Sequence, residues 1–446
     1  MATVLPPLKD TPMSPPPMSL RQDSHQGNCP DLRITEYMVE DLWQMIKKSS
    51  DYGATPDTIG GMSRLALTED DASFRAWFKD EALSMGCEVR VDRVGNMFAV
   101  LPGRNRSLPP IGGRFDGILG VLAGLEVIKA MNAFDHKPWA DIAVINWTNE
   151  EGANYTAGCT GSAVWSHHIT LESALAMPRF DHQSTFGDDL RAIGYDGPYI
   201  PSYQANPLSA HFELHIEQGV ELEREAKQIG IVSGIQGIRW YMVEVHGVRA
   251  HAGSTCMGSR ADAVVAASKM VCYIDELSRL HKLFGTVGKM EIPQASSNVV
   301  SGFVRFTIDL RHREECRLTE VEAAMYARMD DLRSENPHIN FHMRQIWHSP
   351  AAKFDRHALK MVRESAMHIV GEKAVKDEML SHAGHDSALV HLAGVPTAMI
   401  FVPSRGGISH APGEFTSRAQ CGIGLKVMYA TVNAFDRWLE SRDSNL

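Results

Sequence analysis

The run Asp141-Ile-Ala-Val-Ile-Asn-Trp147, with the stretch Thr148-Asn149-Glu150-Glu151-Gly152 that follows it, decides the fold. The run is mostly apolar, which is typical of a strand covered on both faces. A helical pattern over 119–128 precedes it, and shorter strands are predicted over 88–91 and 96–101. A strand, a helix and a second strand in this order predict a parallel sheet, and therefore an α/β protein.

The rest of the chain extends this pattern. Periodic apolar residues predict helices over 36–49, from Thr68 to about residue 85, and over 423–439, and a further buried strand over 395–402. Thr68 followed three residues later by Asp71 is typical of a helix start. Residues 1–31 are rich in proline and polar residues, so we expect a disordered tail there.

The segment 231–348 has a different pattern. Its order of elements is β-α-β-β-α-β, with strands expected over 240–246, 285–291, 303–311 and 339–346 and helices over 260–280 and 318–334. This order is that of a ferredoxin-like unit. We therefore predict that a small domain, 231–348, is inserted into a larger one formed by 32–230 and 349–446.

Composition limits the classes of function. The chain has 446 residues, 44% of them apolar and 22% charged, which excludes global disorder. Its net charge of -10 argues against nucleic-acid and anionic-membrane partners. The seven cysteines are scattered without a Cys-x-x-Cys pair and no apolar run reaches membrane-spanning length, so a cytoplasmic protein is expected. The 20 histidines favour metal or acid-base chemistry.

Polar residues after the buried strands are the candidates for that chemistry, because open parallel sheets bind ligands at the carboxyl ends of their strands. Of the neighbouring Glu150 and Glu151, one can bind a metal while the other acts as general base; a solvated acidic turn is the alternative. His410 follows the strand 395–402, and Asp116 precedes the helix 119–128, where an N-cap is its simpler role. With His215, these carboxylates and imidazoles suit Zn²⁺ or a similar ion.

Nine collinear motifs resemble those of the amidase/hydantoinase/carbamoylase family of metal-dependent amidohydrolases, which includes β-ureidopropionase, N-carbamoyl-L-amino acid hydrolase and allantoate amidohydrolase. They are GGRFDGILGVLAGLEV, NWTNEEG, ELHIEQG, GIQGIRW, AHAG, NVVSG, DLRH, AGHDS and IFVPSRGGISHAP. The resemblance runs from about residue 35 to the C-terminus. It implies a zinc-peptidase-like catalytic domain, an inserted dimerisation domain, a homodimer, and a ureido or amide substrate that carries a carboxylate.

The resemblance also implies roles for individual residues. In that family two metal ions activate a water that attacks a ureido or amide carbon. Asp116 would bridge the ions, Glu151 and His410 would complete one site, and His215 would belong to the other, with Zn²⁺, Mn²⁺, Co²⁺ or Ni²⁺ bound. Glu150 would be the general base. The substrate would be contacted by Arg311, which suits a carboxylate, and by Gln218, His251, Asn298 and His385, with His251 reaching into the partner subunit.

The sequence departs from the family just before Asp116. Family members carry a Gly-Ser-His-x-Asp motif there, whose histidine binds the second metal, but residues 88–135 contain no histidine. About ten residues are missing relative to the family, enough to remove the end of a strand and its loop. The expectation is therefore one metal per subunit.

Three interpretations remain open. The chain is a working hydrolase with one metal or with a replacement ligand such as His211, a catalytically impaired relative that still binds ligands, or a truncated gene product. Among working hydrolases, an N-carbamoyl amino acid or β-ureidopropionate is the expected substrate and allantoate is the alternative.

Overall fold

The computed structural model describes residues 34–54, 62–105, 111–114, 118–155, 157–293 and 295–443, with the backbone alone described for 111–114. The tail predicted over 1–31 and the predicted metal ligand Asp116 lie outside these residues. Within them, no helix combines the length and the apolar character needed to cross a membrane.

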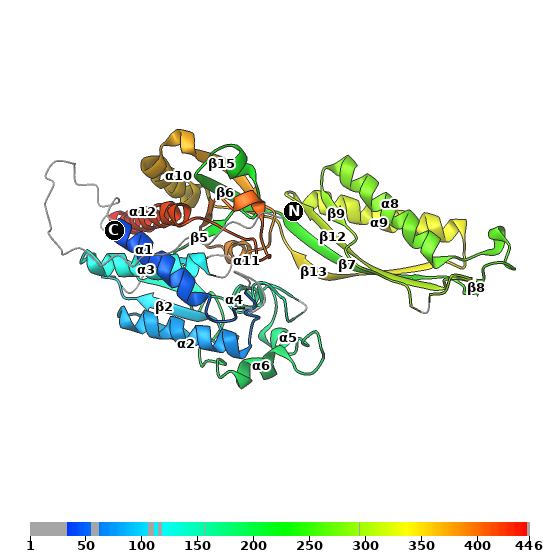
Figure 1. Cartoon of the computed structure of the whole chain (residues 1–446), viewed down its shortest axis with the longest axis horizontal. Helices are drawn as coiled ribbons and strands as arrows, with labels where there is room; N and C mark the ends of the chain where they lie inside the picture. The colour runs from blue at the N-terminus through cyan, green and yellow to red at the C-terminus, as the bar shows by residue number, and fades with distance from the viewer. Residues whose placement is uncertain are drawn as a thin grey trace, which may run out of the picture. The chain divides into compact units, whose positions relative to one another are not determined.

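A mixed sheet forms the larger part of the chain (Figure 1). Its strand order is β1-β2-β4-β3-β5-β16-β6-β14, and β15 pairs with β6. The central strands β4, β3, β5 and β16 run parallel, as the α/β prediction requires. The bounds are Glu88–Val91 (β1), Met97–Leu101 (β2), Ile111–Arg114 (β3), Ile142–Asn146 (β4), Ala210–Ile216 (β5), Ile229–Ile235 (β6), Ala352–Lys353 (β14), Val375–Ser381 (β15) and Thr397–Val402 (β16).

One detail of the predicted sheet is wrong. The strand that precedes the helix and runs parallel to β4 is the four-residue β3, whereas β2 pairs with β4 antiparallel. The sequence Ile111-Gly-Gly-Arg114 is too short and too rich in glycine to show a strand pattern, so no strand is predicted there. β3 lies between β4 and β5 and pairs with both of them in parallel, so it completes the parallel centre of the sheet.

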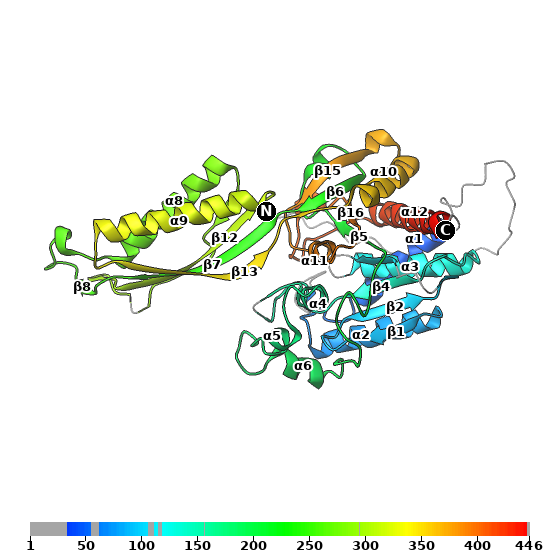
Figure 2. The same ribbon diagram turned by 180° about the vertical axis from the view of Figure 1, so that it is seen from behind.

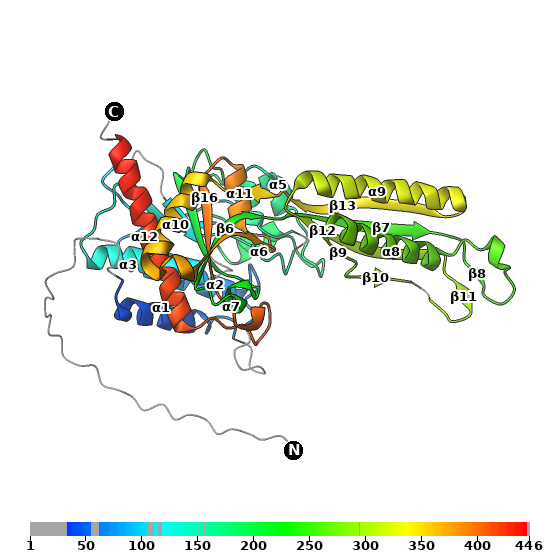
Figure 3. The same cartoon turned by 90° about the horizontal axis from the view of Figure 1, so that it is seen from above.

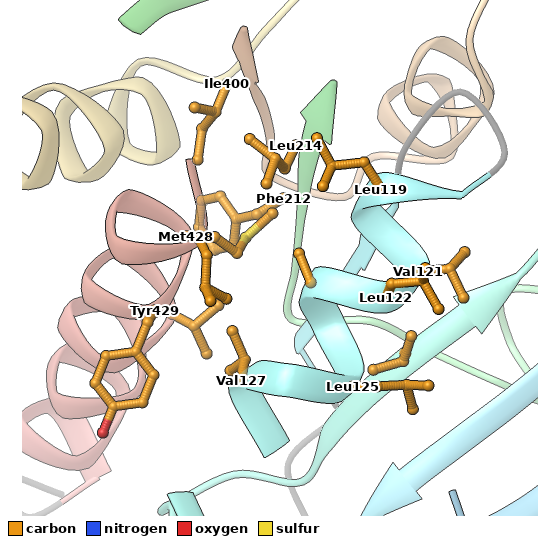
Figure 4. Packing of buried hydrophobic residues seen from close by; sticks show 14 of the residues in the cluster. Leu119, Val121, Leu122, Leu125, Val127, Phe212, Leu214, Ile400, Met428 and Tyr429 are labelled. Atoms are coloured by element: carbon orange, nitrogen blue, oxygen red, sulfur yellow. The ribbon is translucent and has the colours of Figure 1, made fainter. Parts of the chain in front are cut away.

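Helices cover both faces of this sheet. On one face, α1 (Glu36–Ser49), α3 (Leu119–Ala133), α10 (Arg356–Val370) and α12 (Arg418–Asp443) share a hydrophobic core with the strands. Figure 4 shows Leu119 of α3 beside Leu214 of β5, and both belong to the same buried cluster as Val127 and Phe212. On the other face, α4 (Thr160–Trp165) and α11 (Asp386–Leu392) pack over the sheet. The remaining helices are α2 (Glu69–Ser84), α5 (Leu171–Leu175), α6 (Phe186–Ala192) and α7 (Glu221–Arg224).

The start of α2 shows how local sequence sets an element's end. The Thr68 hydroxyl caps the helix by accepting from the backbone nitrogen of Asp71. The Asp71 carboxylate does not close a capping box; it accepts from the backbone nitrogen of Leu67 and from Arg75 Nε, both at 2.9 Å. The helix ends before Gly86, whose φ of +82° suits glycine.

A second, antiparallel sheet forms the inserted ferredoxin-like unit, with strand order β10-β12-β7-β13 and β9 paired to β12. The helices α8 and α9 pack on it side by side (Figure 3). The predicted strand 285–291 is two short strands, because only its ends pair with β12. The bounds are Gly237–His246 (β7), Ala263–His281 (α8), Phe284–Thr286 (β9), Met290–Glu291 (β10), Phe303–His312 (β12), Glu315–Glu335 (α9) and Asn340–Ser349 (β13).

The chain enters and leaves this unit at one end. β6 belongs to the large sheet, so the second sheet begins at Gly237, a few residues after the sequence-based boundary at 231. β13 ends at Ser349, and β14 returns to the large sheet. At the opposite end, β8 (Ala250–His251) pairs with β11 (Val299–Val300) beyond the end of β7 (Figure 2).

Candidate functional site

The central strand β5 has one apolar and one polar face. Phe212, Leu214 and Ile216 join the core beneath α3 and α12. The alternate residues are His211, Glu213 and His215, and all three side chains are buried on the face that α11 covers. Because successive strand residues point to opposite faces, this alternation gathers three polar groups in a closed space.

Glu213 is the centre of this group. The imidazoles of His211 and His385 lie 3.7 Å and 3.6 Å from its two carboxylate oxygens, and the Ser387 hydroxyl donates to Oε2. Burial alone would raise the pKa of Glu213, but the interactions with His211, His385 and His215 outweigh it and lower the pKa to about 2. Glu213 is therefore a buried carboxylate that stays ionised.

Two histidines beside Glu213 are held by other groups. His215 Nδ1 lies 2.6 Å from the carbonyl oxygen of Ile216, which can only accept, so Nδ1 carries the proton. His385 precedes α11, and its Nε2 lies 2.7 Å from the hydroxyl of Ser381. The two rings meet edge to face with their centroids 4.5 Å apart.

The Glu150-Glu151 turn follows β4 and is fixed through its backbone. The side-chain oxygen of Asn96 accepts from the nitrogen of Thr148 at 3.0 Å, and the nitrogen of Cys159 donates to the carbonyl of Glu150 at 2.7 Å. The Cys159 thiol donates to Glu150 Oε1 at 3.6 Å. The partly exposed Glu150 carboxylate is thus directed toward the N-terminus of α4.

Glu151 points elsewhere and reaches a different part of the chain. Its Oε2 lies 3.4 Å from Nε2 of His410, and both side chains are about half exposed. The loop that carries His410 follows β16 and is joined to the loop after β5. Gln218 donates to Ser409 Oγ from its side chain at 2.8 Å and to Ser404 Oγ from its backbone at 3.1 Å. The predicted residues Glu151, His410 and Gln218 therefore meet at one edge of the sheet.

Two groups of side chains have metal-ligand spacing among the described residues. In each, potential ligand atoms lie within 4.8 Å of one another; the groups are Glu213, His215 and His385, and Glu150, Cys159 and Asp386. The Asp386 carboxylate accepts from Ser162, and the Ser381 hydroxyl lies beside Nε2 of His385.

Arg311 lies on β12, at the end of the second sheet that joins the large sheet. Its guanidinium pairs with Asp309 on the same strand, with Nη2 and Oδ2 2.8 Å apart. Nη1 donates to the carbonyl of His382 at 2.9 Å, and His382 lies between β15 and α11. This contact places Arg311 close in space to the segment that carries His385, although the two segments are far apart in the sequence.

His251 and Asn298 lie together, but at the other end of the second sheet. His251 on β8 pairs with Val299 on β11, and the backbone nitrogen of Ala252 donates to the carbonyl of Asn298 at 2.9 Å. Arg311 pairs with Ile238 near the start of β7, and β7 ends at His246, eight residues after Ile238. At the rise of a strand that span is about 26 Å, so Arg311 and the pair His251 and Asn298 are far apart within one chain.

Sequence reasoning missed Glu213 as a site residue, together with Cys159, Ser381 and Ser387. The available signal was in the motif itself: His211, Glu213 and His215 alternate with apolar residues in a strand that is otherwise fully buried. A polar face on a strand at the centre of a covered sheet requires partners, and that requirement marks a site.

Comparisons with known proteins identify relatives of this chain. The model of peptidase family M20/M25/M40 matches residues 110–434. N-carbamoyl-L-amino-acid amidohydrolase of Rhizobium meliloti is 35% identical over 410 residues, which cover 88% of this chain and 95% of the relative. Allantoate amidohydrolase of Bacillus subtilis (strain 168) is 32% identical over 404 residues, covering 84% and 93%. The crystal structure of an amidase of the hydantoinase/carbamoylase family from Burkholderia multivorans superposes with a TM-score of 0.78 at 35% identity, covering 91% of this chain and 98% of that one.

Proposed function

This chain belongs to peptidase family M20/M25/M40 and, within it, to the hydantoinase/carbamoylase amidases, and on that premise we propose that it hydrolyses the C–N bond of an N-carbamoyl amino acid. N-carbamoyl-L-amino acids and β-ureidopropionate are the substrates we favour. The observation that carries the proposal is the arrangement of Glu150 and Glu151, which leave the same turn toward different partners.

The residues at the edge of the sheet fit a divalent metal. Two ligand atoms about 2.1 Å from one tetrahedral ion lie roughly 3.4 Å apart, and Glu151 Oε2 and His410 Nε2 are separated by 3.4 Å. We propose these two side chains as ligands of Zn²⁺, or of Mn²⁺, Co²⁺ or Ni²⁺, with Asp116 as a further ligand from outside the described residues. Such an ion would supply an acidified water and a positive charge near the substrate's carbonyl oxygen.

Glu150 is the proposed general base. Its carboxylate would take the proton of the attacking water and pass it to the leaving nitrogen. This transfer needs a carboxylate that stays close to both the water oxygen and the leaving nitrogen. The backbone bonds of Thr148 and Cys159 hold the turn in place, so Glu150 keeps its position while it is alternately protonated and ionised.

We propose Arg311 as the group that binds the substrate's carboxylate. Its guanidinium pairs with Asp309 through Nε and Nη2, and Nη1 donates to the carbonyl of His382. A substrate carboxylate would be bound by the remaining N–H groups of Nη1 and Nη2. Gln218 and His385, which lie after β5 and before α11, are proposed to contact the ureido end of the substrate.

The protein is proposed to act as a homodimer through its inserted domain, residues 231–348. His251 and Asn298 lie about 26 Å along the sheet from Arg311, so they can reach a substrate held by Arg311 only in another copy of the chain. This separation favours an active site completed by the partner subunit.

Ammonia release tests the proposal. The purified chain, loaded with Zn²⁺ or Mn²⁺, is given an N-carbamoyl-L-amino acid, β-ureidopropionate or allantoate. We expect turnover of at least one of the first two, its loss in Glu150→Gln, and its retention in the control Glu172→Gln, which changes an exposed carboxylate on α5. Turnover of allantoate alone would replace the proposed substrate class. A folded, metal-loaded chain that releases no ammonia from any of the three would overturn the proposal in favour of a catalytically impaired relative.

A further inference from the structure

We propose that Phe284, on strand β9 of the inserted domain, selects the substrate by packing against an apolar side chain next to the substrate's carboxylate. The preferred substrates are then N-carbamoyl-α-amino acids with apolar side chains, rather than β-ureidopropionate or allantoate. The inference deepens the proposed function and rests on it, because it takes Arg311 as the group that binds the carboxylate.

Phe284 and Arg311 are neighbours across two strands. β9 pairs with β12 antiparallel, and in this register Phe284 lies directly opposite Arg311. Opposite residues of an antiparallel pair point to the same face of the sheet, with their Cβ atoms about 5 Å apart. Theirs is the face that α8 and α9 leave uncovered, because the alternate residues Ile308 and Leu310 of β12 pack against the helices. A ligand held by Arg311 therefore lies within reach of the Phe284 ring.

The segment before α11 meets the same corner of the second sheet. The rings of Phe284 and His382 meet edge to face with their centroids 5.5 Å apart, and Arg311 Nη1 donates to the carbonyl of His382 at 2.9 Å. Three residues further along the chain is His385, the proposed contact of the ureido end. Phe284 thus lies at the junction of the two domains, where the proposed substrate contacts of both domains meet.

The surface formed by the Phe284 and His382 rings is uncharged. Gln236 Nε2 contacts His382 Nδ1 and can only donate, so Nδ1 is the acceptor. Burial, together with the nearby charge of Arg311, outweighs the opposite effect of Glu221 and lowers the pKa of His382, so the imidazole is neutral near neutral pH. Beside the charged Arg311, the two rings therefore offer a surface that suits an apolar group.

The exposure of Phe284 gives the energetic reason for selection. Its side chain is 59% exposed, so much of the ring contacts water until a ligand covers it. Removing apolar surface from water is favourable in proportion to the area covered, on the ring and on the ligand alike. A single methylene in an apolar pocket changes specificity roughly 10- to 200-fold. Because the ring forms one wall rather than a closed pocket, we expect an effect near the lower end.

The candidate substrates differ at this position. In an N-carbamoyl-α-amino acid the carbon next to the carboxylate carries the side chain, so binding of the carboxylate to Arg311 brings that side chain to Phe284. β-Ureidopropionate has only hydrogens on this carbon. Allantoate has a second ureido group there, and the Phe284 ring cannot satisfy its polar atoms. An apolar side chain is the group that fits.

Substrate preference tests the role of Phe284. The kcat/KM of the zinc-loaded chain is measured for N-carbamoyl-L-leucine and for N-carbamoylglycine, which has no side chain. We expect the wild type to prefer the leucine compound about 10-fold and Phe284→Ala to lose this preference through the leucine compound alone. Phe284→Leu should restore most of it. The control Tyr326→Ala removes a ring on α9 that is 45% exposed, and it should keep the wild-type preference.

Binding measurements separate this inference from the proposed function. Both compounds are titrated calorimetrically into zinc-loaded chains that carry Glu150→Gln, with and without Phe284→Ala. An unchanged leucine preference in Phe284→Ala, or an equal loss for both compounds, would overturn the role of Phe284 even if the chain hydrolyses them. A leucine preference in binding that depends on Phe284, without hydrolysis by the wild type, would overturn the proposed function alone. Binding of neither compound would overturn both.

Thermal unfolding checks that the variants fold. If Phe284→Ala does not fold, Phe284→Thr takes its place, because threonine suits a strand and offers little apolar surface. It should lose the leucine preference as Phe284→Ala does, and retention of the preference would overturn the inference.

Discussion

Nε2 of His410 lies 3.4 Å from Oε2 of Glu151, although β3 and β5 separate their parent strands β16 and β4 in the sheet. The contact is possible because all four strands are parallel, so both loops leave the same edge and lean over the strands between them. The carboxyl ends of parallel strands are where α/β proteins usually bind their ligands, and these two polar groups meet there.

Removing either partner of this contact should remove metal from the edge site. Glu151→Gln and His410→Ala are each expected to lower activity at least ~100-fold, because a metal ligand matters more than the outer-shell groups that change affinity 10- to 100-fold. The double variant should be no worse than the single ones, since both changes empty the same site. Turnover at saturating Zn²⁺ measures this. Additive losses would mean that the two residues act separately.

Asn96 should be needed for the geometry of the Glu150-Glu151 turn. It is fully buried, accepts from the nitrogen of Thr148 and donates to the carbonyl of Gly161 at 3.1 Å. Asn96→Ala leaves both backbone groups unsatisfied, at about 1–3 kcal/mol each. We expect a less stable protein whose kcat falls more than its KM rises, measured by chemical unfolding and steady-state kinetics. Asn105→Ala, at a partly exposed asparagine far from the turn in sequence, is the control, and equal effects would contradict the assignment.

Arg311→Ala should weaken binding of substrates that carry a carboxylate. A hydrogen bond to a charged group contributes roughly 1.5–3 kcal/mol, so KM should rise on the order of 10- to 100-fold. A substrate analogue with a carboxamide in place of the carboxylate should have the same KM for the wild type and for Arg311→Ala. Arg317→Ala, which changes a half-exposed arginine on α9, serves as the matched control. An equal loss for both substrates would show that Arg311 only supports the fold.

Glu126 should limit stability at neutral pH. This α3 residue is fully buried, and burial together with the nearby Asp41 raises its pKa to about 8. The folded protein therefore binds a proton that the unfolded chain releases above its ordinary pKa of 4.5, so stability falls as the pH rises from about 4.5 to 8. Glu126→Gln should gain about 1–3 kcal/mol near pH 7.5 and nothing below pH 4.5. Melting temperatures across this pH range measure the difference, and a pH-independent gain would contradict it.

Local patterns predicted most elements because their signals are short-range. The helix α1 over Glu36–Ser49 and the strand β1 over Glu88–Val91 have the predicted bounds, since each has a clear period and a definite end. β3 was missed because a four-residue strand with two central glycines has no such period. Its pairing depends on β4 and β5, which lie far away in the sequence.

The sequence by itself determined the fold class, the ferredoxin-like unit, the family, and the set of residue types available for chemistry, because apolar periodicity and collinear motifs are properties of neighbouring residues. Only the tertiary structure decided which of those residues meet. In the structure Glu151 lies beside His410, and Glu213 lies beside three histidines. His251 and Asn298 lie at the opposite end of the second sheet from Arg311. The reason is that contacts across a sheet depend on strand order and register, and these follow from how the whole chain buries its apolar surface.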